Sequence, residues 1–486
     1  MNSANSRTLR FIMQKDENTG IAALDDPDIS IGEWKRRCFA PLEHSAVDAI
    51  AWDIGLESEA CRVYRKGPLP FRAHPVVERW AAQGFDWLEE CVAETHRAGM
   101  EAFWNHRISE VDLPHPLGHS CPHNDPCRKN ELKQAHPDWL IPCWWPQGLW
   151  NLANPELRVH KVAMLRNLMR NYPLDGLQLD FARHTPCLPP GREWECRDGA
   201  TEFVRQVRRM LQEVGARSGR RPLLLARVAE TVEGNHLDGL EVEKWIAEGW
   251  IDILVPGGRS IAVDIAGYRA LPGGEAIRIC PSWDGHHTNE GGHRPPSALL
   301  RGIFANYLEQ GADSISLFNW LEDKPLHRPY REILSEEFSV SGFRRGKEIY
   351  MADRRGEYPW AGNYLYRSDD KPLPATVAHG AGTIIPVEIH SDRNMDRLEL
   401  LIENLKPGDL AEVGFNGAPL AVGSYEPERP DELHGFDPAG TRPKYPGANC
   451  RIGLPAKPGA NFVSLRFRAN ANPVLFTVRD LKIHAE

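Results

Sequence analysis

Eight short apolar runs alternate with helical patterns between about residues 8 and 320. The runs are LRFIMQ (9–14), AVDAIAWD (46–53), EAFWNHR (101–107), DGLQLDF (175–181), PLLLARV (222–228), IDILVPG (251–257), AIRICPS (276–282) and SISLFNW (314–320). Apolar residues at helical spacing predict helices between them, over 85–98, 155–172, 200–214 and 298–310. Asn154 as N-cap and Pro155 at the first helical position predict the start of the second helix. Such alternation is typical of a parallel sheet buried on both faces. We therefore expect an α/β fold, a (β/α)8 TIM barrel. An open doubly wound sheet is the alternative, although no Gly-rich fingerprint follows the first strand.

The pattern changes after about residue 345. Helical spacing disappears, and apolar positions alternate instead over 398–402, 463–467 and 474–478. This period of two predicts a C-terminal antiparallel β-sandwich. The polar, Pro- and Gly-rich residues 425–449 are expected to form a long loop. The predicted domains are a barrel over 1–344 and an accessory sandwich over 345–486.

Composition narrows the function. The 486 residues carry a net charge of -9, which argues against a dedicated nucleic-acid binder. No apolar run approaches the roughly 20 residues of a membrane helix, so no membrane partner is expected. The start, MNSANSRTLRFIM, lacks the features of a signal peptide, which favours a cytoplasmic location for the chain as given, or a periplasmic or secreted one if a leader was removed. Trp is frequent, with 15 copies against 16 Phe and 11 Tyr. Its flat face suits sugar stacking and core packing equally.

Polar or aromatic side chains close most of the apolar runs. In a barrel the active site lies at the C-terminal ends of the strands, so their shared placement indicates one site. Near these ends the candidate substrate-binding residues are Asp53, Trp104, Asn105, His106, Arg107, Gln178, Arg183, His184, Trp283, His286, His287, Asn319 and Trp320, and the candidate catalytic residues are Asp180, Glu230 and Asp284.

Asp180 and Glu230 are the central pair of this set. The strand period of two places Gln178 and Asp180 on one face, toward the barrel mouth, where Arg183 or Gln178 could satisfy the Asp180 carboxylate. Glu230 follows the next strand, about 5 Å away. Two carboxylates at this spacing suit a retaining glycosidase, and a separation of about 6.5–9.5 Å would suit inversion.

Residues 137–185 resemble the glycosyl-hydrolase-like family 10 domains, which are barrel proteins. The matching positions are Trp150, Asn154, Pro155, Arg158, Asp175, Gly176, Asp180, Phe181 and Arg183. The segments WNHR (104–107) and GADSISLFNW (311–320) are similar to that family's third and last strands. The resemblance implies a carbohydrate-active barrel.

The run DGLQLD is more distantly similar to strand four of the alpha-amylase superfamily. That likeness implies Asp180 as nucleophile, Glu230 as acid/base and Asp284 as a third carboxylate. The sequence departs from the superfamily at Gln178, where an Arg is usual. This departure leaves the charge partner of Asp180 to another residue.

These observations predict a glycoside hydrolase that acts on an oligo- or polysaccharide without a cofactor. One alternative is a metal-dependent hydrolase of amide or ester bonds, using the histidines at positions 106, 115, 119, 123, 286 and 287. The loop over 115–127, with three His and two Cys, offers zinc-ligand chemistry. The other alternative is a non-catalytic glycan-binding protein that has kept the barrel.

Overall fold

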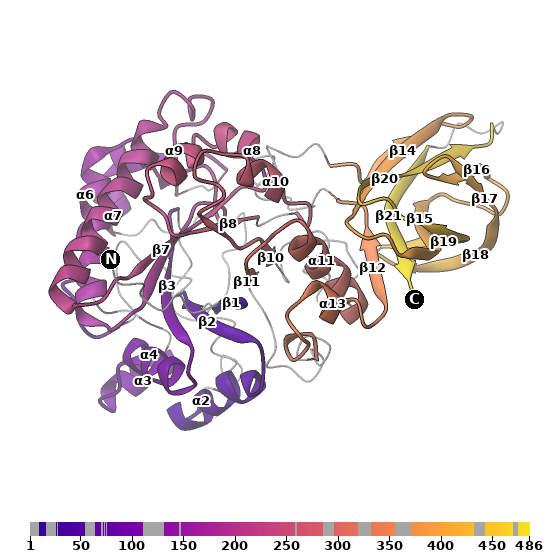
Figure 1. Cartoon of the computed structure of the whole chain (residues 1–486). Coiled ribbons are helices and arrows are strands. Elements are labelled where there is room, and N and C mark those ends of the chain that lie inside the picture. Colours follow the sequence, from indigo (N-terminus) through magenta and orange to yellow (C-terminus); the bar gives the residue numbers. More distant parts are fainter. Residues whose placement is uncertain are drawn as a thin grey trace.

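The computed structural model shows a larger α/β unit followed along the chain by a smaller β unit (Figure 1). It describes residues 9–15, 26, 28–53, 64–69, 71, 73, 75–109, 131–144, 147–257, 260–284, 296–318, 332–354, 371–431, 443–469 and 475–486. Within these ranges, no helix is both long enough and apolar enough to cross a bilayer.

All eight predicted apolar runs form strands of one parallel sheet. Its order is β10-β11-β1-β2-β3-β6-β7-β8-β9. The strands are β1 (Phe11–Lys15), β2 (Val47–Trp52), β3 (Glu101–Arg107), β6 (Gly176–Asp180), β7 (Leu223–Val228), β8 (Ile253–Pro256), β9 (Arg278–Ile279), β10 (Ser282–Asp284) and β11 (Ile315–Phe318). The sequence order of the neighbours is the order expected of successive β/α units.

The predicted closed barrel needs a correction, because the sheet curls without closing. The seventh predicted run is split into β9 and β10, which are the two ends of the ladder and are separated only by Cys280 and Pro281. The N–H of Cys280 still donates to Leu254 (2.8 Å), and that of Asp313 donates to Ile279 (2.9 Å). Pro281 has no N–H to give to a ladder, which accounts for the break. The two edge strands of the sheet, β9 and β10, are therefore consecutive in the chain, although no ladder joins them.

Helices cover the outside of the curled sheet (Figure 1). They are α2 (Ile31–Phe39), α3 (Pro75–Ala82), α4 (Trp87–Arg97), α6 (Pro155–Asn171), α7 (Asp198–Ser218), α8 (Val232–Leu237), α9 (Val242–Ala247), α10 (Ile265–Arg269) and α11 (Ser297–Glu309). Shorter elements are η1 (Ala40–Leu42), α5 (Glu131–Ala135), η2 (Pro137–Trp139), β4 (Leu140–Ile141), β5 (Leu149–Trp150) and α13 (Val340–Phe343). The four predicted helices are confirmed as α4, α6, α7 and α11. Helix α6 begins as its sequence predicts, because the Asn154 side chain caps it and Pro155 occupies the first turn.

The strands have two different faces, and the difference positions the site. Leu177 and Leu179 of β6 belong to the large core between the strands and the helices. Gly176, Gln178 and Asp180 lie on the other face, inside the curl. There Gly176 leaves room for the ring of Phe103, which a Cβ atom would approach to 2.9 Å. The period of two therefore turns Gln178 and Asp180 inward, as predicted.

The β unit consists of two antiparallel sheets around one core. Its strands are β12 (Glu348–Met351), β13 (Ala375–Val377), β14 (Gly382–Ile389), β15 (Asn394–Glu403), β16 (Leu410–Phe415), β17 (Ala418–Leu420), β18 (Val422–Pro430), β19 (Lys444–Pro455), β20 (Gly459–Phe467) and β21 (Phe476–Ala485). The sheets have the orders β12-β21-β15-β19-β18, with β13 on β21, and β14-β20-β16-β17. Apolar side chains from both sheets, such as Leu398 and Val463, share the core.

The long loop predicted over 425–449 is wrong at both ends. Strand β18 continues to Pro430 and β19 begins at Lys444, and residues 432–442 lie outside the described part of the chain. Strand β18 is at the edge of its sheet, where prolines are tolerated because one side of the strand needs no ladder donors. The Pro content that indicated a loop is thus compatible with an edge strand.

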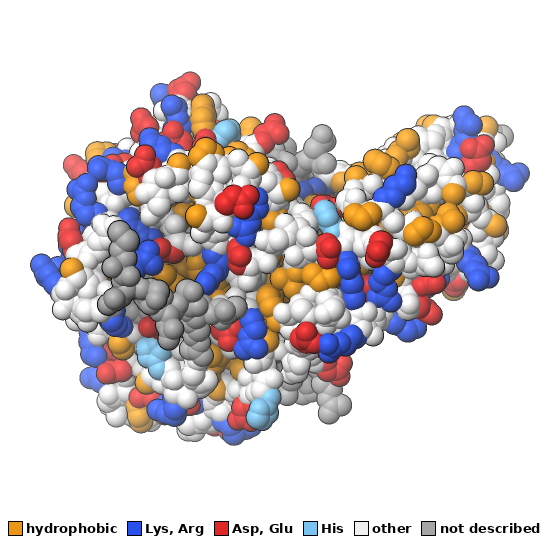
Figure 2. Space-filling view, in the orientation of Figure 1, with side chains coloured by type: hydrophobic (Ala, Val, Ile, Leu, Met, Phe, Trp, Pro, Cys, Tyr) orange, Lys and Arg blue, Asp and Glu red, His pale blue; other side chains and the backbone are white. Residues whose placement is uncertain are grey.

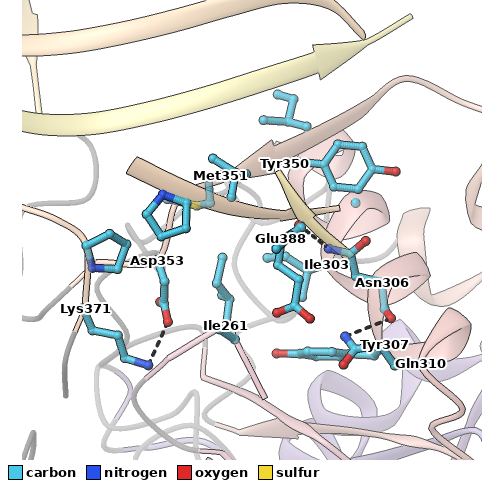
Figure 3. A pocket seen from close by; sticks show the side chains of 17 residues that line it. Ile261, Ile303, Asn306, Tyr307, Gln310, Tyr350, Met351, Asp353, Lys371 and Glu388 are labelled. Carbon is cyan, nitrogen blue, oxygen red and sulfur yellow. Dashed lines mark hydrogen bonds and ion pairs between the residues drawn. The ribbon is translucent and has the colours of Figure 1, made fainter. Parts of the chain in front are cut away.

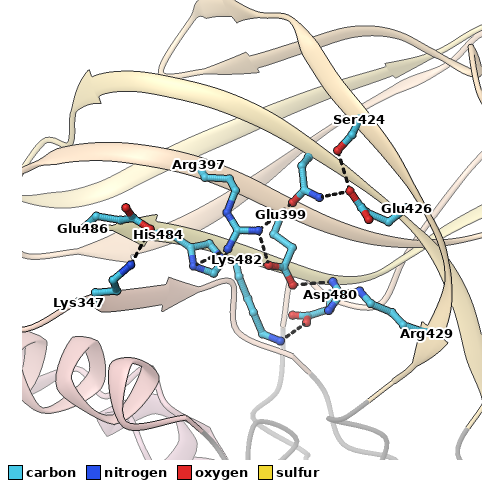
Figure 4. Close-up of polar contacts among 11 residues, drawn as sticks. Lys347, Arg397, Glu399, Ser424, Glu426, Arg429, Asp480, Lys482, His484 and Glu486 are labelled. Carbon is cyan, nitrogen blue, oxygen red and sulfur yellow. Dashed lines mark hydrogen bonds and ion pairs between the residues drawn. The ribbon is translucent and has the colours of Figure 1, made fainter.

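A network of charges covers the outer face of the six-stranded sheet (Figure 4). Glu399 of β15 lies at its centre and contacts Arg429 (2.6 Å), His484 (3.0 Å) and Arg397 (3.2 Å). Burial raises the pKa of Glu399, but the hydrogen bond from His484 and the positive charges of Arg429 and Lys482 outweigh burial and bring that pKa to about 2. The ionised carboxylate therefore stabilises the folded state.

Glu399→Gln should change the acid stability of the protein. Because the folded pKa lies below the ordinary value of 4.5, the carboxylate contributes fully above that value and loses its contribution as the pH falls toward 2. The wild-type Tm should therefore fall more steeply than that of the variant over this window, and the two should converge in strong acid. Glu412→Gln, whose side chain is 72% exposed, is the control and should follow the wild type. Parallel curves for Glu399→Gln would contradict the assignment.

Candidate active site

Asp53, directly after β2, organises one half of the polar cluster inside the curl. Its Oδ2 accepts hydrogen bonds from Gln14 of β1 (2.9 Å) and from Asn105 (2.7 Å) and Arg107 (2.8 Å) of β3. The amide of Gln178 on β6 then donates to Asn105 (2.7 Å). The chain of contacts thus crosses four neighbouring strands. All five side chains are buried, so the network is fixed by its own hydrogen bonds.

Asp180 organises the other half, at the end of β6. The backbone register places it opposite Arg227 of β7, and Nη1 of Arg227 lies 3.1 Å from each carboxylate oxygen. Both side chains have 0% exposure. The sequence offered Arg183 or Gln178 as the partner of the Asp180 carboxylate, but its partner is Arg227 instead. A buried carboxylate paired in this way keeps a charge partner without water.

The ring of Phe318, at the end of β11, contacts the guanidinium groups of both Arg183 and Arg227. The guanidinium carbon of Arg227 lies 3.7 Å from the ring centroid, and that of Arg183 lies 4.8 Å from it. Arg227 thus reaches from β7 across the interior while it holds Asp180. Its Nε and Nη2 are buried without a hydrogen-bond partner in the described part of the chain. The ring and Asp180 together fix the plane of this guanidinium.

Glu230 stands two residues beyond the end of β7 and is 7% exposed. The backbone beside it is held firmly, because the N–H of Ala229 donates to Asn235 (3.0 Å) and its carbonyl accepts from the Tyr268 hydroxyl (2.7 Å). Asn235 also donates to that hydroxyl (2.6 Å). Burial raises the pKa of Tyr268 well above its ordinary value, so the hydroxyl stays protonated and remains a donor. The segment carrying Glu230 is thereby fixed to α8 and α10.

Several predicted residues lie elsewhere. Trp104 and Trp283 face the large core between strands and helices, and His106 faces Lys161 of α6 at 3.4 Å. Nδ1 of His184 contacts the Ser109 carbonyl (3.1 Å). Asp284 ends β10, and its side chain lies outside the description, as do residues His286, His287, Asn319 and Trp320. The strand period of two explains Trp104, His106 and Trp283, because alternate residues of β3 and β10 point outward, toward the helices.

The Trp content reflects packing more than sugar contact. Six tryptophans rank among the largest fully buried side chains, namely Trp34, Trp52, Trp80, Trp150, Trp245 and Trp283. Trp194 is the one Trp among the exposed large hydrophobic residues of the described chain. The core interpretation of the Trp enrichment therefore holds for most described copies.

Three residues of the cluster were missed from the sequence: Gln14, Arg227 and Phe318. Each occupies one of the alternate positions of its strand that face the inside of the curl. The period of two could therefore have identified all three from the sequence. Arg227 follows Leu225 of the interior apolar cluster by two residues, and Gln14 follows Ile12 in the same way. These inward positions lie within or at the end of the strands, whereas most of the predicted site residues lie at the strand ends or beyond them.

A metal site receives no support from the described residues. They contain no group of three or more His, Cys, Asp or Glu side chains placed to hold an ion. Of the six histidines in the metal-dependent hypothesis, His106 is described, and the other five, together with the whole loop over 115–127, lie outside the described residues.

Comparisons with known proteins give structural likeness alone. No family model matches the chain, so the resemblance to the family 10-like domains is not supported, and no curated protein matches either. The structure is similar to α-L-fucosidase isoenzyme 2 from Paenibacillus thiaminolyticus, at 10% identity and a TM-score of 0.46, over 94% of this chain and 99% of that one.

Two further likenesses are to other glycosidases. A GH36 α-galactosidase from Geobacillus stearothermophilus is 11% identical with a TM-score of 0.39, over 95% of this chain and 55% of that one. A chitinase from Rhizomucor miehei is 10% identical with a TM-score of 0.39, over 67% and 99%. With TM-scores below 0.5, these likenesses do not settle the activity of this chain.

Proposed function

We propose that the protein is a glycoside hydrolase whose site lies at the C-terminal ends of β6 and β7. The observation that carries the proposal is the placement of Asp180 and Glu230 at the ends of neighbouring parallel strands, with Asp180 held by Arg227. In the full proposal the curled sheet functions as a (β/α)8-type barrel over 1–344. Residues 345–486 form an accessory β-sandwich.

The proposed chemistry is a double displacement. An Asp180 oxygen attacks the anomeric carbon while the bond to the leaving oxygen breaks, and Glu230 gives that oxygen its proton. Glu230 then removes a proton from water, whose oxygen attacks the same carbon and releases Asp180. Glu230 suits the acid/base role because it retains some exposure and the backbone of the preceding Ala229 is fixed by Asn235 and Tyr268.

The surrounding polar groups would position the sugar. Asn105 and Arg107 are already oriented by Asp53, Gln178 is oriented by Asn105, and Arg183 lies over Phe318. We propose these side chains as hydroxyl ligands. Asp284, His286, His287, Asn319 and Trp320 remain proposed members from their positions after the last two strands. Trp104, His106 and Trp283 are left out because of their outward or core placement.

One observation favours a second candidate, a non-catalytic glycan-binding protein. The Asp180 side chain has 0% exposure, so a sugar can reach it only after the groups that cover it rearrange. If they never do, the ion pair with Arg227 is structural and the barrel mouth only binds. Turnover separates the two functions, because both require carbohydrate binding.

The test is a hydrolysis screen with purified protein against aryl glycosides and polysaccharides, run in the presence of a chelator. Turnover under these conditions supports the proposed glycosidase and identifies the sugar. Glycan binding without turnover on the whole panel would favour the binding protein. Turnover that appears only after a divalent metal is restored would contradict the two-carboxylate mechanism and favour the metal-dependent hydrolase.

A further inference from the structure

A hollow lies where the α/β unit meets the β unit. Its volume is about 340 Å³, and its walls come from α11, β12, β14 and the segments near Ile261 and Lys371 (Figure 3). The two units are in close contact here, because a methyl group at Gly302 would collide with the Ile349 carbonyl. The volume is within the range of about 300–1,000 Å³ that is typical of small-molecule sites, which are frequent at such junctions.

One end of this junction cleft carries a paired charge. Nζ of Lys371 lies 2.8 Å from both Asp353 and the Ser260 hydroxyl, and Ser260 also contacts Asp353. All three side chains are largely buried. The lysine and the aspartate compensate each other, so this end contributes polar atoms without a net charge.

The other end carries carboxamides and one carboxylate. Asn306 of α11 donates to the Glu388 carbonyl and accepts from the N–H of His390, both at 2.9 Å, which joins the helix to β14. Gln310 donates to the Asn306 carbonyl (3.2 Å). The Glu388 carboxylate accepts from His390 (2.6 Å) and its side chain is 39% exposed. Figure 3 shows Ile261 and Met351 between the two polar ends. The Glu388 carboxylate and the absence of a net positive charge at the Lys371 end disfavour an anionic ligand. The cleft offers hydrogen-bond acceptors beside apolar walls.

The cleft continues onto an exposed apolar strip of the β unit. Pro386, Glu388 and Ala460 line the cleft from the outward face of β14 and β20. Phe462 lies opposite Pro386 in the ladder, on the same face, and is 46% exposed. Ile384, two residues from Pro386, is 67% exposed. Figure 2 shows hydrophobic side chains gathered on the visible face of the β unit. An aromatic ring thus stands beside the opening of the cleft.

We propose that the junction cleft and Phe462 form a second, non-catalytic binding site for a neutral oligosaccharide. A pyranose ring has an apolar C–H face that can cover an aromatic ring and hydroxyls that pair with carboxylates and carboxamides. Phe462 supplies the ring, and Glu388, Gln310 and Asp353 supply the polar partners. The choice of carbohydrate rests on the proposed function, whereas the preference for a neutral ligand rests on the charges of the cleft itself.

Affinity electrophoresis in gels containing soluble neutral polysaccharides tests this site. The panel holds hydroxyethylcellulose, galactomannan, xyloglucan, arabinoxylan and glycogen, and every protein carries Asp180→Asn to prevent cleavage. At least one polymer should retard this parent protein, and Phe462→Ala should weaken the retardation roughly fivefold, the order expected for loss of an aromatic contact. Leu475→Ala is the matched control, because Leu475 is an exposed apolar residue of the same unit, and it should change nothing.

A second variant tests the cleft rather than the strip. Ala460→Trp places a large side chain at the outward-facing wall of the cleft and should abolish retardation while leaving the Tm within a few degrees of the parent. Absence of retardation by every polymer would overturn the proposal, as would retardation that both variants leave intact. A dimer in light scattering that Phe462→Ala converts to a monomer would also overturn it, because a second copy would then cover the strip. Retardation without hydrolysis by the wild type would defeat the proposed catalysis alone.

Discussion

Asp180→Asn is expected to lower kcat/KM by about 10³-fold or more on any glycoside that the wild type cleaves, because an amide cannot attack the anomeric carbon. Glu230→Gln should cost roughly 10²–10⁴-fold on a substrate whose leaving group needs a proton. On a dinitrophenyl glycoside, which leaves without protonation, Glu230→Gln should regain much of its first-step rate. Asp180→Asn should not, and a stopped-flow measurement of dinitrophenol release separates the two roles.

The control for both variants is Glu233→Gln, an exposed carboxylate of α8 three residues beyond Glu230. Its kinetics should match those of the wild type. Since Asp180 is paired with Arg227, the assay temperature must lie below the Tm of Asp180→Asn, which circular dichroism provides. Equal rates for Asp180→Asn and the wild type would remove Asp180 from the mechanism. Rescue of Asp180→Asn but not of Glu230→Gln would exchange their roles.

Local patterns in the sequence were sufficient for the strands of the parallel sheet and for four of its helices. The eight apolar runs became strands of one sheet, and Asn154 with Pro155 marked the start of α6 as capping rules predict. The inward direction of Gln178 and Asp180 also followed from the period of two. These properties depend on residues a few positions apart, where side-chain direction is set by the backbone alone.

Which side chains pair with each other depends on the strand register and on the length of the side chains. The pattern of residue types along the sequence contains neither. Arg227 satisfies Asp180 because the β6–β7 ladder sets them opposite each other, and it then extends to Phe318 across the interior. The edge position of β18 likewise arises from hydrogen bonding between distant segments. A residue-type pattern can identify strand ends, whereas tertiary pairing decides which side chains meet there.

Arg227→Met should be among the most destabilising single changes in the α/β unit. It keeps most of the apolar stem but removes the cation, so Asp180 is left as a buried charge without its partner. Breaking a buried pair from one side typically costs about 3–5 kcal/mol, since neither water nor another cation compensates the remaining charge. Urea denaturation followed by circular dichroism measures this loss, provided that the slope of the transition is unchanged.

The double variant Arg227→Met with Asp180→Asn shows whether the cost is electrostatic. Because it removes both charges, it should recover much of the stability that Arg227→Met loses, and the difference from additivity gives the coupling within the pair. Arg205→Met is the surface control, since Arg205 pairs with Glu202 on the solvent-facing side of α7 and should change stability by less than about 1 kcal/mol. If Arg227→Met costs no more than Arg205→Met, the ion pair between Arg227 and Asp180 does not stabilise the fold. In that case Arg227 would not be the group that holds the proposed nucleophile, and its assigned role as the partner of Asp180 would be wrong.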